Sequence, residues 1–267
     1  MIIQQLLEQP EDPSTDVALL VNAIKRADRF LNEVSAPYKI PLRGIQTPPP
    51  LLRIYQTRVD RRPKDSIPAL HTKLDNLLAE EFGIKYRSTS VFTTSNQQVA
   101  FEYGYPTFAL PLDDFKFCWS PVSDDALSHF SLRGFLRFVE SDGNDAAKAK
   151  FKSEGISVRH FAPEATNHVV QSFIAAGDTD VAPLFDRWVE TRYREARYQE
   201  TDYSAAHKAG HEVMWHCSEV AIIRADPLKA PHAAELDRMF NTTLFSSPLT
   251  TMRGAIEEIN NKVNLGK

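Results

Sequence analysis

Apolar residues recur three or four positions apart in several stretches, which is the spacing of one face of an α-helix. Residues 15–31 carry such a stripe, and a hydroxyl or carboxylate side chain among residues 14–16 can cap its start. Residues 68–82 carry leucines at the same spacing and are followed by Gly83, a residue typical of helix ends. Both stretches are predicted to be helices. The leucines expected to face inward in the second are Leu70, Leu74, Leu77 and Leu78.

The same spacing predicts a mainly helical region over residues 126–200. One helix is expected around residues 130–139, one around 146–151 and a long one over 181–198. Two more are predicted near the end of the chain, at 232–240 and 250–263. The inward residues of the long helix are expected to include Leu184, Trp188, Thr191 and Tyr193.

Alternating or β-branched apolar stretches lie between these helices and predict strands. Residues 51–59 and 91–92 each predict a strand, and residues 105–117 predict a strand, a turn and a second strand. Pro106 and Pro111 are expected to keep this hairpin near a sheet edge. Residues 210–224 predict two strands or one bent strand. Helices and strands together predict an α+β fold.

Prolines divide the N-terminal part of the chain. Pro37, Pro41 and the run Pro48-Pro49-Pro50 forbid a helix there and predict an extended connector. No stretch has the composition of a disordered linker. We therefore expect a single domain over residues 1–267, with residues 1–50 as a helical extension and connector and residues 126–200 as a helical insertion.

Composition indicates an ordinary globular protein. The 267 residues are 42% hydrophobic and 25% charged, with a formal net charge of −4, which speaks against a protein that coats nucleic acid. Cys118 and Cys217 are far apart in the sequence, so neither a disulfide framework nor a cysteine zinc site is predicted. The N-terminus does not resemble a signal peptide and no apolar run is long enough to span a bilayer, so a cytoplasmic location is expected.

Two common site motifs do not fit. His211 and His216 are five residues apart, whereas the helical zinc-protease motif needs two histidines four apart. Neither GxGxxG nor GxxxxGK[ST] occurs, so no glycine-rich phosphate loop is predicted. We expect no metal.

The stretch from Arg87 to Gly104 combines a basic residue, two hydroxyl clusters, a short strand and a helical turn. Ser95 or Asn96 can cap that turn, which is expected to bury one face and to end at Gly104. The residues of that face are Val99, Ala100 and Tyr103. Hydroxyls beside a helix N-terminus suit a phosphate or a sugar. Strand propensity and helix capping alone also account for them, and both interpretations stay open here.

Basic residues are most concentrated just after residue 57. Arg58, Arg61, Arg62 and Lys64 lie within seven positions of one another. Such a run can be a solvated loop. It can equally grip a phosphate, because the guanidinium group of arginine makes paired hydrogen bonds to phosphate oxygens.

Three features follow one another along the chain. They are an arginine at a strand end, a hydroxyl-bearing strand followed by a helix with alanine, and a glutamate at the start of a late strand. The set resembles the ADP-ribosyltransferase superfamily, in its Arg–Ser/Thr–Glu, cholera-toxin-like branch, and looks similar to transferases carried by bacteriophages and bacteria. Its middle motif is matched by Phe92-Thr93-Thr94-Ser95 followed by Ala100. The resemblance covers about residues 50–125 and 208–224.

This resemblance implies a split, mixed or antiparallel β-sheet core and transfer of ADP-ribose from NAD+ without a metal. It implies that Glu212 stabilises an oxocarbenium-like state, and that Arg58, with Arg53 as second choice, holds the phosphates. The hydroxyl of the motif maps to Thr94 or Thr93, ahead of Ser88 or Ser90. The residues expected to bind NAD+ are Arg58, Arg87, Ser90, Thr93, Thr94 and Tyr103.

One departure from the family concerns the acceptor. Gly210 occupies the position two before Glu212, where related enzymes carry Glu or Gln. The residue that activates the acceptor is therefore missing or supplied from elsewhere. The resemblance implies a host protein as acceptor, with nucleic acid as an alternative. A further alternative is an inactive protein of this fold that binds a protein partner.

Overall fold

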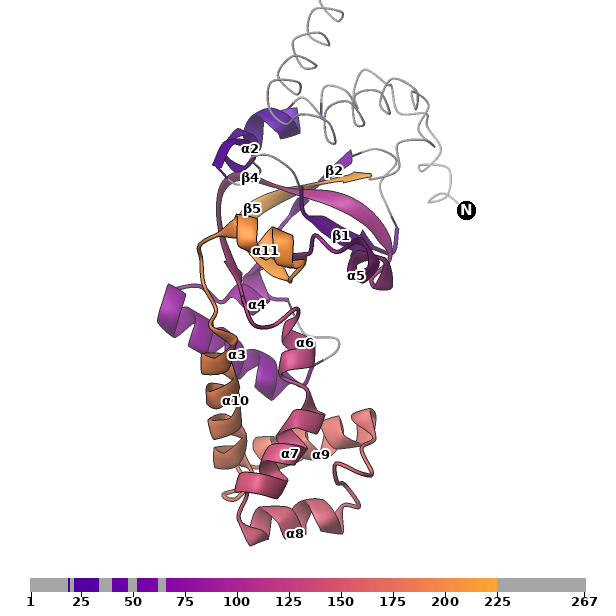
Figure 1. Cartoon of the computed structure of the whole chain (residues 1–267), viewed down its shortest axis with the longest axis vertical. Helices are drawn as coiled ribbons and strands as arrows, with labels where there is room; N and C mark the ends of the chain where they lie inside the picture. Colours follow the sequence, from indigo (N-terminus) through magenta and orange to yellow (C-terminus); the bar gives the residue numbers. More distant parts are fainter. Residues whose placement is uncertain (1–18, 20–21, 34–39, 48–51, 62–65, 225–267) are drawn as a thin grey trace, which may run out of the picture. The chain divides into compact units, whose positions relative to one another are not determined.

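A computed structural model of the chain describes residues 19, 22–33, 40–47, 52–61 and 66–224 (Figure 1). Their contacts divide the chain into two compact units. The first comprises the described parts of residues 1–57, 93–116 and 217–267. The second comprises those of residues 58–92 and 117–216.

Five strands form one sheet with the order β1-β4-β5-β2, and β3 pairs with β5 off this path. β1 pairs antiparallel with β4, placing Leu42 opposite Phe108, and β2 pairs antiparallel with β5, placing Leu52 opposite Ile223. The strands are β1 (Leu42–Ile45), β2 (Leu52–Gln56), β3 (Val91–Thr93), β4 (Tyr105–Trp119) and β5 (Val213–Arg224).

Helices accompany the sheet, so the predicted α+β class is confirmed. The first unit contains α2 (Asp28–Glu33) and α5 (Gln97–Glu102). The second contains α3 (Pro68–Phe82), α4 (Tyr86–Thr89), α6 (Ala126–His129), α7 (Leu132–Asp142), α8 (Asp145–Ser153), α9 (Pro163–Ala175), α10 (Ala182–Ala196) and α11 (Tyr203–Ala209).

Several predicted elements are confirmed. The helix over residues 68–82 is α3, and Gly83 ends it in the left-handed conformation with φ 75°. The helices expected at 130–139, 146–151 and 181–198 correspond to α7, α8 and α10 with small shifts at their ends. The last predicted strand region forms one strand, β5.

The expected hairpin over residues 105–117 is wrong, because β4 is one continuous strand between β1 and β5. Its prolines do not mark an edge strand. Pro106 lies at the beginning of the strand, where proline is tolerated. β1 pairs only with Tyr105–Phe108, so Pro111 lies beyond that pairing.

Two further expectations need correction. The proline-containing connector includes a strand, β1, directly after Pro41. Tyr103 is 49% exposed rather than buried, because α5 ends before it and buries only Ala100 completely.

Some predicted elements fall outside the described residues. These are the helices at 232–240 and 250–263, the first part of the N-terminal helix, and the proline run at 48–50. Where that N-terminal stripe is described, residues 22–26 are helical, and Phe30 and Leu31 of α2 are buried as expected.

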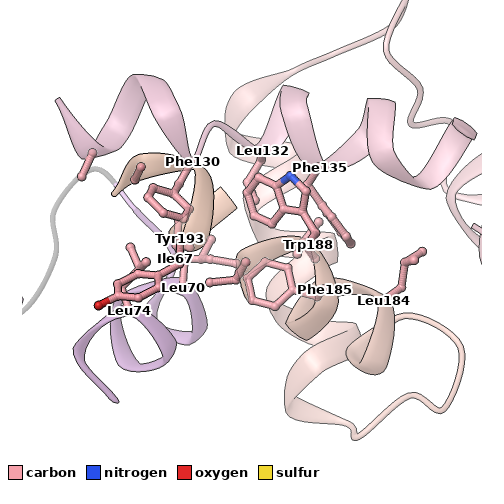
Figure 2. Packing of buried hydrophobic residues seen from close by; sticks show 14 of the residues in the cluster. Ile67, Leu70, Leu74, Phe130, Leu132, Phe135, Leu184, Phe185, Trp188 and Tyr193 are labelled. Atoms are coloured by element: carbon pink, nitrogen blue, oxygen red, sulfur yellow. The ribbon is translucent and has the colours of Figure 1, made fainter. Parts of the chain in front are cut away.

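Aliphatic and aromatic side chains together form the core of the second unit, and Trp188 lies among several aromatic rings (Figure 2). Trp188 of α10 is 2% exposed, and its ring centroid lies 5.3 Å from Phe135, 5.7 Å from Phe185 and 6.3 Å from Phe130. α7 contacts α8, α9 and α10, and α10 also contacts α3. Burial of these large rings stabilises the helices that carry the second unit's polar residues.

Candidate functional site

Glu212 lies between α11 and β5 in a segment that is anchored on both sides. Gly210 ends α11 with φ 77°, and its N–H donates to the carbonyl oxygens of Ala206 and His207. The Nδ1 atom of His211 lies 2.8 Å from the carbonyl oxygen of Ser120, to which it donates. The N–H of Glu212 donates to the carbonyl oxygen of Asp124 at 2.7 Å. These bonds hold the backbone from which the carboxylate projects.

The carboxylate of Glu212 forms an ion pair with Arg87 of α4. Arg87 Nη1 lies 3.2 Å from Glu212 Oε1. The side chains are 11% and 26% exposed, respectively, so the arginine is largely buried and the glutamate remains accessible in part. A partly buried, charge-assisted contact of this kind holds two side chains in a defined geometry.

The ring of Phe92 contacts both Arg87 and a second arginine, Arg61. The guanidinium carbon of Arg61 lies 3.9 Å from the centroid of the Phe92 ring, and that of Arg87 lies 4.7 Å from it. The N–H of Arg61 also donates to the carbonyl oxygen of Ser88 at 3.1 Å. Guanidinium groups pack favourably against aromatic faces. We call Arg61, Arg87, Phe92 and Glu212 the Glu212 cluster.

Burial perturbs the acid of the Glu212 cluster. Desolvation raises the pKa of Glu212 above its ordinary value of 4.5, and the nearby Asp125 carboxylate acts in the same direction. Arg87 and Arg61 oppose this effect, yet the net direction remains upward. A carboxyl group with a pKa shifted by desolvation beside a specific charged partner is a candidate functional group.

The second unit also brings together two residues that we did not predict. Asp75 and His71 of α3 are 3% and 8% exposed, and both contact Ser88. A signal for them exists in the sequence. They stand four residues apart, each directly after Leu70 or Leu74 of the buried leucine stripe, and polar residues beside such a stripe require partners.

Three of the predicted site residues besides Glu212 belong to the second unit. Arg87 contacts Glu212, as described above. Ser90 is 5% exposed and follows α4 directly. Arg58 follows β2 and is exposed. The basic run therefore contributes Arg61 to the Glu212 cluster, whereas Arg62 and Lys64 lie outside the described residues.

The other predicted residues belong to the first unit. Thr93 and Thr94 are 4% and 7% exposed. Thr94 exchanges backbone hydrogen bonds with Leu42, and its hydroxyl accepts the N–H of Asn96, which caps α5. Tyr103 lies at the end of α5. Arg53 is an exposed residue of β2 whose guanidinium carbon lies 5.9 Å from the Tyr55 ring centroid.

Two buried polar atoms, one in the Glu212 cluster and one three residues after Arg87 along the chain, can bind a polar ligand. Arg87 Nε and Ser90 Oγ are buried and have no hydrogen-bond partner within the described part of the chain. A guanidinium N–H is a donor to phosphate, and a serine hydroxyl can bind a ribose or an amide. Over the same residues, no group of three or more His, Cys, Asp or Glu side chains is arranged to hold a metal ion.

Two further observations bear on the class of protein. Among the described helices, none has the length and apolar character needed to cross a membrane. Comparison with protein-family models, with curated proteins and with solved structures gives no match.

Proposed function

We propose that the protein is an NAD+-dependent mono-ADP-ribosyltransferase whose reaction centre is Glu212. The observation that carries the proposal is the ion pair between Glu212 and Arg87. The guanidinium groups of Arg87 and Arg61 both lie over the ring of Phe92. The arrangement supplies one carboxylate and two guanidinium groups within a single compact unit. Those are the charges needed to bind a dinucleotide and to stabilise positive charge on its ribose.

Each residue has a role in this proposal. Glu212 accepts a hydrogen bond from the ribose 2′-hydroxyl and stabilises the oxocarbenium-like state in which the bond to nicotinamide breaks. Arg87 and Arg61 hold the phosphates, and the Ser90 hydroxyl, which is buried beside α4, contacts the nicotinamide ribose. Arg58, Thr93, Thr94 and Tyr103 remain predictions of the family resemblance.

The acceptor we propose is a host protein, modified in the cytoplasm of the cell. Gly210 cannot activate an acceptor, since it has no side chain and serves to end α11. An acceptor whose own nucleophile is reactive enough would need no such help. The net charge of −4 makes nucleic acid the weaker alternative.

The experiment compares wild-type protein with Glu212→Gln. Purified protein is incubated with NAD+, free nicotinamide is quantified, and transfer of labelled ADP-ribose to lysate proteins is followed in parallel. We expect nicotinamide release by the wild type and a loss of roughly 10²–10⁴-fold in the variant, because a positioned carboxylate contributes about that much.

Glu190→Gln provides the matched control. Glu190 is also a glutamate of the second unit in an ion pair, with Lys73 at 2.8 Å, but it makes no contact with the Glu212 cluster among the described residues. The control should retain wild-type activity. Equal activity of Glu212→Gln and the wild type would refute the assignment of the carboxylate, and no nicotinamide release with any lysate would refute the enzymatic function.

A second candidate function is that of a binding protein without catalysis, which engages a protein partner. Gly210, at the position where related enzymes carry an acidic or amide side chain, favours it. Calorimetry with NAD+ separates the two functions. Saturable heat of binding supports the enzyme, whereas no binding of NAD+ together with a stable complex in pull-down supports the binding protein.

A further inference from the structure

Helix α4, which carries Arg87, lacks the usual means of starting a helix. The first N–H groups of a helix have no partner within it, and a side chain at the position before the first turn commonly supplies one. Lys85 occupies that position and its side chain makes no capping hydrogen bond. A helix of four residues has little stability of its own, so its orientation depends on outside contacts.

Asp75 of α3 supplies the missing acceptor. Its Oδ1 atom accepts the N–H of Arg87 at 2.7 Å and that of Ser88 at 3.2 Å. Its Oδ2 atom accepts the hydroxyl of Ser88. Asp75 is 3% exposed, and all three bonds go to residues of α4. A buried carboxylate is costly unless it is fully hydrogen-bonded, so α4 and Asp75 hold each other in place.

His71, one helical turn before Asp75 and 3.5 Å from it between Nε2 and Oδ2, also contacts Ser88. Its Nε2 atom lies 3.0 Å from Ser88 Oγ. A carboxylate only accepts, so the hydroxyl hydrogen of Ser88 points to Asp75 and His71 donates from Nε2. Burial, together with Arg87 and Arg61, lowers the pKa of His71 although Asp75 opposes this, which favours the neutral ring. The serine side chain is therefore fixed by two partners.

We infer that Asp75 is a positioning residue of the Glu212 cluster: it caps α4 from α3 and thereby directs the Arg87 guanidinium to Glu212 and Phe92. The inference rests on the proposed function for its role in catalysis. The geometry is separate from it, since Asp75 contacts the backbone N–H of Arg87 and Arg87 Nη1 contacts Glu212. Its test therefore uses readouts that do not require NAD+ cleavage.

The first readout is hydrogen exchange at the backbone amide of Arg87, measured by NMR on labelled full-length protein. Asp75→Ala should accelerate this exchange by about tenfold or more, because a hydrogen bond to a charged acceptor protects by a factor of that order. Asp75→Asn keeps an oxygen acceptor of similar shape. Its exchange should fall between those of the wild type and Asp75→Ala.

The second readout is the titration of the Glu212 carboxyl carbon in protein labelled at glutamate, assigned with Glu212→Gln. Arg87 favours the carboxylate, so a displaced Arg87 should move the titration of Glu212 to higher pH in Asp75→Ala. If NAD+ is cleaved, kcat/KM should fall up to about 10²-fold, as for other misplaced binding groups. If the wild type does not cleave NAD+, the proposed function fails and the first two readouts still judge Asp75.

Asp178→Ala is the matched control. Asp178 also accepts two backbone N–H groups, those of Asp180 and Val181, and an ion pair joins it to Lys150. Its loss should leave both readouts unchanged. Unchanged exchange and titration in Asp75→Ala would overturn the inference. If Asp75→Ala does not fold, unchanged values in Asp75→Asn would overturn it.

Discussion

Each unit contains a cluster of arginine and carboxylate side chains. The pKa of a carboxyl group is lowered in the cluster of the first unit and raised in that of the second. In the first unit, Arg26 contacts both Asp113 and Glu219, and Gln56 also donates to Glu219 at 2.6 Å. Hydrogen bonds from Arg26 lower the pKa of Asp113, whose side chain is 49% exposed. In the second unit, burial dominates and raises the pKa of Glu212 although Arg87 pairs with it.

The difference separates a stabilising ion pair from a candidate reaction centre. Asp113 is a solvated carboxylate, and pairing with Arg26 makes its charged form more stable than it would be alone. Glu212 is held where its charge is less stable than in water, so binding a ligand with developing positive charge would relieve that cost. The same residue types therefore support structure in one unit and, in our proposal, chemistry in the other.

In this comparison, the largest difference in the rate of NAD+ cleavage should come from replacing the arginine of each cluster, one at a time. Arg87→Met should lower kcat/KM for NAD+ cleavage about 10²-fold, because it removes a phosphate-binding group of our proposal and leaves Glu212 without its ion-pair partner. Arg26→Met is the counterpart in the first unit and should leave the rate close to wild type. Steady-state kinetics on both variants checks this. Equal losses would erase the distinction between the two clusters.

The pH dependence should distinguish the clusters next. Glu212 must be ionised to stabilise positive charge, so the rate of NAD+ cleavage should rise with pH through a pKa above 4.5, the ordinary value for glutamate. Asp113→Asn should not move this limb. The rate is measured across pH in wild type and Asp113→Asn. A limb at or below the ordinary glutamate value would contradict the burial effect.

A smaller effect is expected from the aromatic ring of the Glu212 cluster. Phe92→Leu keeps an apolar side chain but removes the ring under Arg61 and Arg87. It should weaken NAD+ binding roughly 5–30-fold, given about 0.5–1 kcal/mol for each of the two cation–π contacts. Phe115→Leu is the control, since Arg29 lies 4.9 Å from that ring centroid in the first unit. Calorimetry should show full NAD+ affinity for the control and not for Phe92→Leu.

The smallest effect concerns stability at low pH. The pKa of Asp113 lies below its ordinary value, so its pairing contributes stability above the unfolded-state value of about 3.9 and loses it as the pH falls through the folded-state value. Asp113→Asn should cost about 0.2–1 kcal/mol at neutral pH and less in acid, because the pair is exposed. Denaturant unfolding at both pH values measures it. A cost that grows in acid would reverse the sign.

Periodic apolar patterns predicted most of the helices and several strands. The leucines of α3 and the aromatic residues of α10 report their buried faces directly, since burial repeats with the helix period. β4 could not be predicted in the same way. Whether Pro111 interrupts a strand depends on which neighbouring strand pairs at that position. The pairing of distant segments cannot be predicted from local composition.

The residues of the candidate site also differ in whether the sequence predicts them. Glu212 was predicted from the order of the motifs, whereas Arg87 was predicted only as one of several NAD+-binding residues and the arginine of the motif was assigned to Arg58. Asp75 acts through a hydrogen bond to α4, and its partner is set by the packing of α3 rather than by spacing. The sequence does not distinguish Arg61 from its basic neighbours. Its contact with the ring of Phe92, which the structure shows, does.

The central claim is that Glu212 and Arg87 bind NAD+ together. It is tested most directly by a crystal structure of Glu212→Gln grown with saturating NAD+, in which cleavage is suppressed. The account predicts the nicotinamide ribose within hydrogen-bonding distance of residue 212 and a phosphate oxygen within hydrogen-bonding distance of Arg87. NAD+ bound away from both residues, or no NAD+ at saturating concentration, would contradict it.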